Sequence, residues 1–270
     1  GEDSAFLEAV MVEAATSGKL EELSMTIEMT IEREIRQARN LIGKISGSGD
    51  SDENIIILAH TDTWFSGADD NASGIAVMIG LAEYYGAKQP IHDVYFVASP
   101  GHHHGAGGSA FLVDNYPDLI TNNMLSVNLE HIASIGMARI DANMMDRVRD
   151  NYGNLLASLS PTNTDSLWHG VQMSNRTPFL VNAWRQASES NMYSQPANVW
   201  EASRFMPGES TSLDIAGAFV VQNVETNHWY HSSGSMPETI SPESLKRAFL
   251  LYNDFINLAD QSSKAEIQAR

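Results

Sequence analysis

Histidine and carboxylate side chains follow the end of a short apolar segment in this chain. His60 and Asp62 come directly after residues 55–59, a β-branched apolar run typical of a strand buried on both faces of a parallel sheet. In open α/β sheets, ligands and catalytic groups collect outside the carboxyl ends of the strands. Because imidazole nitrogen and carboxylate oxygen both bind metals, this His-x-Asp indicates a metal site.

Most of the chain's nine histidines lie at similar places. A single histidine after a strand is more often structural than a metal ligand. Several strand ends that carry histidine, most of them with a carboxylate nearby, instead favour one shared metal centre. The histidines at predicted strand ends are His60, His102, His103, His104, His131, His228 and His231, and the two elsewhere are His92 and His169.

The composition limits the chemistry and the partners. The chain has no cysteine, so any metal must be held by His, Asp or Glu. With 34 acidic and 16 basic residues the formal net charge is −18, which argues against nucleic acid or anionic lipid as a main partner. No apolar run has the length of a membrane span, and the first residues resemble no signal peptide. We expect no membrane insertion.

Strands that alternate with helices predict crossover units and a largely parallel sheet in a single domain over residues 1–270. Residues 1–35 are interpreted as the tail of an omitted or processed upstream segment, and 141–205 as a lid or insertion. Alternation from Met25 to Ile31 predicts a half-buried strand. Further strands are expected at 40–45, 55–59, 94–98, 125–129 and 218–224, and helices at 5–15, 73–85, 109–115, 145–159, 179–188 and 242–260.

The segment after His60 carries the most specific motif, Gly67-Ala68-Asp69-Asp70-Asn71-Ala72-Ser73-Gly74. Over residues 40–259 the chain resembles the co-catalytic zinc exopeptidases of peptidase family M28, which include bacterial leucyl aminopeptidases and glutamate carboxypeptidase. This resemblance implies a three-layer α/β/α fold with a mixed, mostly parallel sheet. It also implies that Asp70 bridges two metals, that His60 is a ligand, and that Asp62 holds the His60 ring through its other nitrogen. The alternative for residues 69–71 is an acidic helix N-cap.

The chain departs from the family where the family has Glu-Glu. Gly105, Gly108 and Ser109 keep the register of that motif, so His102 falls on the general-base position and His103 on a ligand position. Histidine can perform both roles, since it binds zinc and titrates near neutral pH.

The remaining family positions follow later in the chain. Glu130 stands where the resemblance implies an Asp ligand, and His131 is expected to point to the other face if the strand continues. His231, after Tyr230, matches the last ligand. His131, Glu209 and Tyr230 are expected to support the ligands or contact substrate, with a solvated loop carboxylate equally open for Glu209.

The resemblance implies a zinc-dependent, aminopeptidase-like hydrolase of amide or peptide bonds with an altered site, acting on a peptide or small amide or ester substrate. One metal would be held by His60, Glu130 and Asp70, the other by His231, His103 and Asp70, with one or two Zn²⁺ or other divalent ions bound. Two alternatives are a non-catalytic binding module on a degenerate peptidase fold and a single-zinc acyl transferase like the glutaminyl cyclases. Relatives are usually exported, which favours a periplasmic or extracellular location.

Overall fold

The computed structural model describes residues 2–19, 24, 26, 28–32, 34–133, 170–191, 199–201, 206–224 and 231–270. The chain divides into two units, Gly1–Gln37 and Ala38–Arg270. The first unit contains helix α1 (Glu2–Thr16), which confirms the helix expected at 5–15. The second unit contains the sheet and its covering helices, and it holds the predicted metal site.

A mixed seven-stranded sheet forms the centre of the second unit, with the strand order β1-β3-β2-β4-β7-β5-β6. Neighbouring strands are parallel except for the β1–β3 and β7–β5 pairs. The mixed, mostly parallel sheet is therefore confirmed. Its strands are β1 (Leu41–Ile45), β2 (Asn54–His60), β3 (Asp93–Ser99), β4 (Asn123–Asn128), β5 (Gly170–Met173), β6 (Val199–Glu201) and β7 (Val220–Val224).

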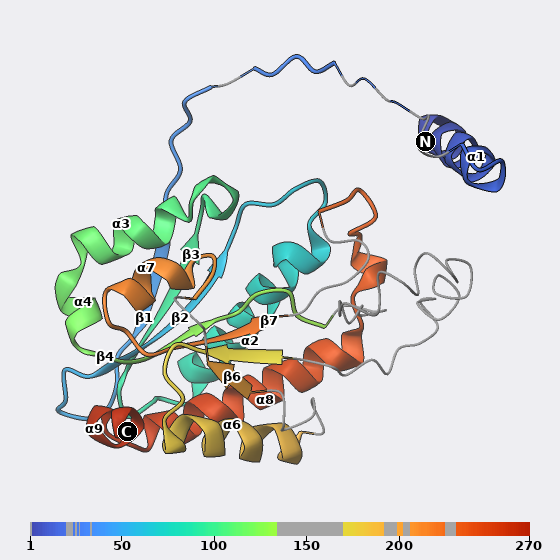
Figure 1. Cartoon of the computed structure of the whole chain (residues 1–270). Helices are drawn as coiled ribbons and strands as arrows, with labels where there is room; N and C mark the ends of the chain where they lie inside the picture. Colours follow the sequence, from blue (N-terminus) through green and yellow to red (C-terminus); the bar gives the residue numbers. More distant parts are fainter. Residues whose placement is uncertain are drawn as a thin grey trace. The chain divides into compact units, whose positions relative to one another are not determined.

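Helices cover both faces of this sheet, which confirms the three-layer arrangement (Figure 1). One face packs against α2 (Gly74–Ala87), α6 (Pro178–Ser190), α8 (Pro242–Asp260) and α9 (Lys264–Gln268). The other face packs against α3 (Gly107–Asn115), α4 (Pro117–Thr121) and α7 (Ser210–Ile215). Three short turns complete the described helical structure: η2 (Ala68–Ser73), η3 (His102–His104) and η4 (Pro237–Thr239).

Strand β2 contributes to both hydrophobic cores, as its continuous apolar run predicts. Ile55 and Ile57 pack into the core beneath α2 and α8, whereas Ile56 and Leu58 pack into the core beneath α3 and α7. All four are fully buried because successive side chains of a strand point to opposite faces. The strand ends at His60, which lies at the carboxyl end of the sheet between its neighbours β3 and β4.

Helix α8 has the bounds that the sequence predicts and closes one face of the sheet. Ser241 caps its first turn by accepting a hydrogen bond from the Ser244 N–H at 3.2 Å. Tyr252 and Phe255 pack edge-on against Trp184 of α6, with ring centroids 5.6 and 5.4 Å apart. Among the described residues, no helix is both long and apolar enough to cross a membrane.

Two expectations about strands and insertions differ from the structure. The strand predicted from Met25 to Ile31 is wrong, since the described residues of this segment have no regular secondary structure and Met29 and Ile31 are 75% and 66% exposed. Alternation alone does not make a strand, because a strand also needs a hydrogen-bonded neighbour, and none of the described strands pairs with this segment.

The lid or insertion predicted over 141–205 does not hold for residues 170–191 and 199–201. Strands β5 and β6 belong to the sheet, and α6 packs in the core beside α8. The sequence did not reveal β5 because a four-residue strand is too short to show a clear period. The helix predicted at 145–159 lies outside the described residues.

Truncating Phe255 should test the packing between α6 and α8. Phe255→Ala should lower the free energy of unfolding by about 3–5 kcal/mol, because the side chain is fully buried against Trp184. Leu250→Ala, on the same helix but 36% exposed, should cost less than about 1 kcal/mol. Urea unfolding followed by circular dichroism measures both, and equal losses would contradict this packing.

Candidate metal centre

The carboxylate of Asp70 lies at the centre of a cluster of imidazole rings. Its side chain is only 4% exposed. Oδ1 lies 2.8 Å from His60 Nε2 and 3.4 Å from His131 Nε2. Oδ2 lies 3.0 Å from His231 Nε2 and 3.6 Å from His103 Nε2. Each oxygen of one buried carboxylate therefore faces two imidazole nitrogens.

Small residues allow the tight turn η2 that places Asp70. Gly67, in the left-handed region with φ of 55°, leaves no room for a Cβ beside the Thr63 side chain and the Asp70 carbonyl. Thr63 Oγ1 donates a hydrogen bond to that carbonyl at 2.6 Å. Asp69 and Asp70 lie in the first turn of η2, as the alternative expected, but the N-caps are Gly67 for η2 and Ser73 for α2, so residues 69–71 cap neither helix.

The ring of His60 is held through its main-chain neighbour rather than through a carboxylate. Nδ1 donates to the carbonyl oxygen of Asp62 at 2.8 Å, whereas the Asp62 Oδ1 atom lies 3.8 Å away. The ring is fully buried. Nδ1 carries the proton in this bond, so Nε2 is the nitrogen that faces Asp70 and would bind a metal.

The carboxylate of Asp62 instead anchors the loop that carries the next histidines. Its Oδ1 accepts the backbone N–H groups of Gly101 and His102 at 2.8 and 3.0 Å, and its Oδ2 accepts that of His103 at 3.3 Å. Burial disfavours the charged carboxylate, but the hydrogen bonds from His102 and His103 outweigh it and lower the pKa of Asp62. Asp62 thus connects the carboxyl ends of β2 and β3.

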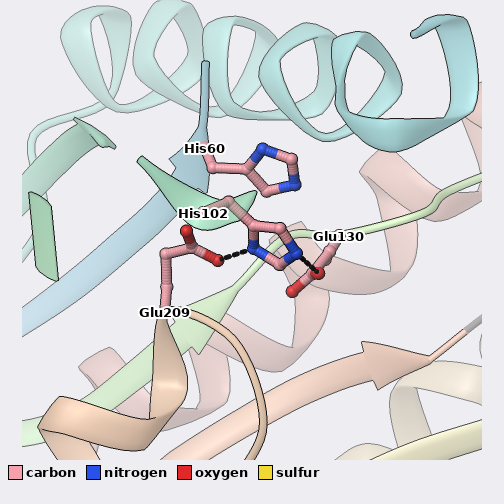
Figure 2. Close-up of side chains that lie close together, drawn as sticks. All are labelled: His60, His102, Glu130 and Glu209. Atoms are coloured by element: carbon pink, nitrogen blue, oxygen red, sulfur yellow. Dashed lines mark hydrogen bonds and ion pairs between the residues drawn. The ribbon is translucent and has the colours of Figure 1, made fainter. Parts of the chain in front are cut away.

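His102 lies between two glutamates (Figure 2). Its Nδ1 lies 2.6 Å from Glu209 Oε2, and its Nε2 lies 3.5 Å from Glu130 Oε1. The ring stacks on that of His60 with centroids 4.0 Å apart. Burial opposes the charged imidazolium, but Glu209, Glu130 and Asp70 outweigh it and raise the pKa of His102 to about 9.

Glu209 is fully buried, so the solvated alternative for this residue is wrong. It precedes α7 and follows Gly208, whose φ of 61° lies in the left-handed region. A Cβ at position 208 would lie 3.0 Å from Cε1 of His102 and 3.4 Å from Oε2 of Glu130. Glycine at this position therefore lets the Glu209 loop approach the His102 ring closely.

His103 and His231 face the other oxygen of Asp70. Their rings pack edge-on with centroids 5.0 Å apart, and Trp64 lies 5.2 Å from the His103 ring. Burial lowers the pKa of His103, and the attraction of Asp70 does not offset it. His103 therefore favours its neutral form, which is the form that binds a metal ion.

The backbone after β4 turns the His131 ring into the cluster. Asn71 donates to the Leu129 carbonyl at 2.8 Å and accepts the His131 N–H at 3.3 Å, while Ser73 accepts the Ile132 N–H at 3.0 Å. His131 has φ of 51°, so strand alternation ends before it. The expectation that its side chain points to the other face is wrong.

The electrostatics of the cluster follow from this placement. Burial opposes ionisation of Asp70, but contacts with His131 and His60 outweigh it and hold its pKa far below the usual range. Burial likewise opposes the charged form of His131, yet Asp70, Glu130 and Asp69 raise its pKa to about 9. Without a metal, protons on these rings balance the buried carboxylates.

Glu130 lies between two histidines. Its Oε1 is 3.5 Å from His102 Nε2 and 3.6 Å from His131 Nε2, and its Oε2 accepts a hydrogen bond from Asn128 at 2.8 Å. The carboxylate is thus held in the cluster from the side of β4.

Other histidines lie apart from the cluster or outside the described residues. His92 packs against Asp260 and Glu53, with nitrogen–oxygen distances of 3.4 and 3.7 Å, and has a structural role. His104 is exposed. The predicted residue Tyr230, together with His169 and His228, lies outside the described residues.

The donor atoms fit divalent metal ions. Among the described residues, His60 Nε2, both Asp70 carboxylate oxygens and His103 Nε2 are buried without completing a hydrogen bond, which is costly unless a cation binds there. Two sets have donor atoms within 4.8 Å of one another, one of His60, Asp70 and His103 and one of His60, His102, Glu130 and Glu209. Tetrahedral zinc separates its ligand atoms by about 3.3 Å, close to the spacings around Asp70.

Sequence reasoning missed several supporting residues. Asn71 is predicted only as part of the alternative helix cap, and Ser73 has no role among the predictions from the sequence, although the side chains of both hold the backbone at His131. Their polar side chains within the motif were a usable signal. Gly208 gave no signal, because the need for glycine there arises from a contact with His102 that only the fold creates.

The metal-free protein should become less stable as the pH rises. His102 and His131 have folded-state pKa values of about 9, above the unfolded value near 6.5. Their stabilisation is complete below pH 6.5 and is lost as pH rises through 9, by at most about 3 kcal/mol for His131. Denaturant unfolding in the presence of a chelator, below pH 6.5 and above pH 9, measures this loss of stability. His131→Asn should reduce the loss and His104→Asn should not, and an undiminished loss in His131→Asn would contradict this.

Comparison with known proteins agrees with the fold. The chain is similar to the zinc aminopeptidase BSAP from Bacillus subtilis, with a TM-score of 0.61 and 16% identity over 83% of this chain and 51% of that one. It is also similar to a glutaminyl cyclase from an Acidobacteriales bacterium, with a TM-score of 0.57 and 18% identity over 82% and 73% of the two chains.

Sequence relatives match a shorter region. A probable zinc metalloprotease of Pyricularia oryzae is 28% identical over 93 residues, which cover 31% of this chain and 18% of the relative. The alkaline phosphatase isozyme conversion protein of Escherichia coli is 31% identical over 101 residues, 31% of this chain and 29% of the relative. The chain thus spans less than a third of either relative. The model of peptidase family M28 matches residues 40–256, and the chain therefore belongs to that family.

Proposed function

We propose that this chain is a zinc-dependent hydrolase that cleaves peptide bonds after the N-terminal residue of its substrate. One observation carries the proposal: each oxygen of the buried Asp70 carboxylate faces two imidazole nitrogens at 2.8–3.6 Å. A carboxylate so placed can bridge two divalent ions. Membership of peptidase family M28 and the aminopeptidases among the similar structures support a peptide substrate.

His60, Asp70, His103 and His231 would hold the metal. Zinc suits this set because it accepts imidazole nitrogen and carboxylate oxygen in tetrahedral geometry. When bound, the metal would act as a Lewis acid that polarises the carbonyl group of the scissile bond. The Nδ1 bond to the Asp62 carbonyl holds the His60 ring with Nε2 directed to this position.

His102 is the side chain best placed to move protons. Amide hydrolysis requires a base that removes a proton from the attacking water and an acid that protonates the leaving amine. The ring of His102 is fixed by Glu209 at 2.6 Å and by stacking on His60 at 4.0 Å. His102 thus takes the part that a glutamate has in the related peptidases, and Glu209 acts on it as a positioning residue.

Replacing the bridging carboxylate should remove both metal and activity. Asp70→Asn should lower kcat/KM at least about 100-fold, because an amide cannot supply two anionic oxygens to the metals. Activity is measured on a panel of aminoacyl p-nitroanilides and metal content by elemental analysis. The matched control Asp118→Asn alters an exposed carboxylate on α4 and should change neither value.

Two results would contradict the proposed function. Wild-type protein that binds zinc tightly yet hydrolyses no member of the panel would support the binding-module alternative. Conversion of N-terminal glutaminyl peptides to a cyclic product with one metal per chain would support the acyl-transferase alternative.

Replacing Glu209 should affect turnover rather than metal binding. Glu209→Gln keeps the side-chain shape but removes the charge that fixes His102, so kcat should fall about 10- to 100-fold with KM and zinc content little changed. The acidic limb of the pH–rate profile should also shift. Glu238→Gln, at an exposed position, is the control. Unchanged kcat, or loss of zinc, would show that Glu209 does not act through His102.

A further inference from the structure

We propose that four histidines and one aspartate form the metal-binding set, with His131 as the fourth histidine. In this arrangement His60 and His131, which face Asp70 Oδ1, would hold one metal, and His103 and His231, which face Oδ2, would hold the other. His131 takes the ligand position that the family resemblance assigns to Glu130. This inference rests on the proposed function, since it concerns the same metal ions.

The Nε2 atom of His131 lies about as far from Asp70 as those of the other three histidines, although of these four only His60 and His103 have donor atoms within 4.8 Å of each other and of Asp70. His131 Nε2 lies 3.4 Å from Asp70 Oδ1, within the 2.8–3.6 Å range of the other three. The His131 side chain is only 9% exposed, so the ring reaches Asp70 from inside the protein. The two carboxylate oxygens thus have matching surroundings, with two imidazole nitrogens each.

The backbone around His131 is built to direct this ring inward. A non-glycine residue in the left-handed region is strained, so the surrounding structure must hold His131 there. Two side chains of the Asp70 motif do so: Asn71 accepts the N–H of His131, and Ser73 accepts that of Ile132. The segment that positions the bridging carboxylate therefore also positions His131.

The carboxylate of Glu130 contacts Asn128 and two histidines of the cluster rather than Asp70. Asn128 binds one of its oxygens at 2.8 Å, and the other lies between His102 and His131. With Glu209 it forms a chain across the site, from Glu209 through His102 to Glu130. This places the Glu130 carboxylate next to the rings of two histidines, where it balances the positive charge of the metal pair from outside the ligand set.

A set with four imidazoles has a distinct metal preference. Imidazole-rich sites favour zinc, cobalt, nickel and copper, whereas oxygen-rich sites favour magnesium, calcium and manganese. We therefore expect zinc to remain bound in an excess of manganese. Displacement of zinc by manganese would overturn the inference.

Two variants separate His131 from Glu130 as the ligand. His131→Asn removes the imidazole but suits the left-handed backbone, since asparagine is tolerated there. Zinc affinity, measured by competition with a chromophoric chelator, should fall at least about 10-fold in His131→Asn. Glu130→Gln should lower the affinity less than His131→Asn does, because Glu130 balances charge from outside the ligand set. His104→Asn, which alters an exposed histidine of the same tract, should retain the wild-type affinity.

The reverse result would overturn the inference: wild-type affinity in His131→Asn with loss of zinc in Glu130→Gln. Wild-type protein that binds no zinc would instead refute the proposed function itself, so the two failures are distinguishable. A second measurement needs no variant. In wild-type protein loaded with cadmium-113, four histidine nitrogens should show coupling to the metal, and coupling to three or fewer would overturn the inference.

Discussion

The contact between one buried carboxylate and the imidazole nitrogens around it is the interaction on which this centre depends. Asp70 is 4% exposed, and charge so far from water is costly unless opposite charge accompanies it. A proton on His131 provides part of that charge in the metal-free protein, and the contact with Asp70 raises the pKa of His131 to about 9. Divalent ions would replace that proton, so metal binding and proton release are coupled.

The fold brings the ligands together by a general property of parallel sheets. His60 ends β2, and His103 and His131 follow β3 and β4; these adjacent strands have their carboxyl ends at one edge of the sheet. Hydrogen bonds between the loops then set the directions of the rings. Asp62 links the ends of β2 and β3, while Asn71 and Ser73 link the Asp70 turn to the end of β4. These polar side chains connect the strand ends into one centre.

The sequence predicts the parts of this structure that depend on local pattern. The buried strand before His60, the spacing of His60 and Asp70, and helix α8 all follow from periodicity or motif, and the structure contains each of them. Ring directions could not be predicted, because they depend on single backbone angles and on contacts distant in sequence. Strand alternation misplaces His131, whose φ is 51°, and the burial of Glu209 follows from the approach of α7 to His102.

The anomalous diffraction of zinc-loaded crystals at the zinc edge tests the central claim most directly. We expect two anomalous peaks, one beside each oxygen of Asp70, with the Nε2 atoms of His60 and His131 bound to one and those of His103 and His231 to the other. Zinc–nitrogen distances should be about 2.0–2.1 Å. The absence of any peak at bonding distance from Asp70 would contradict the account.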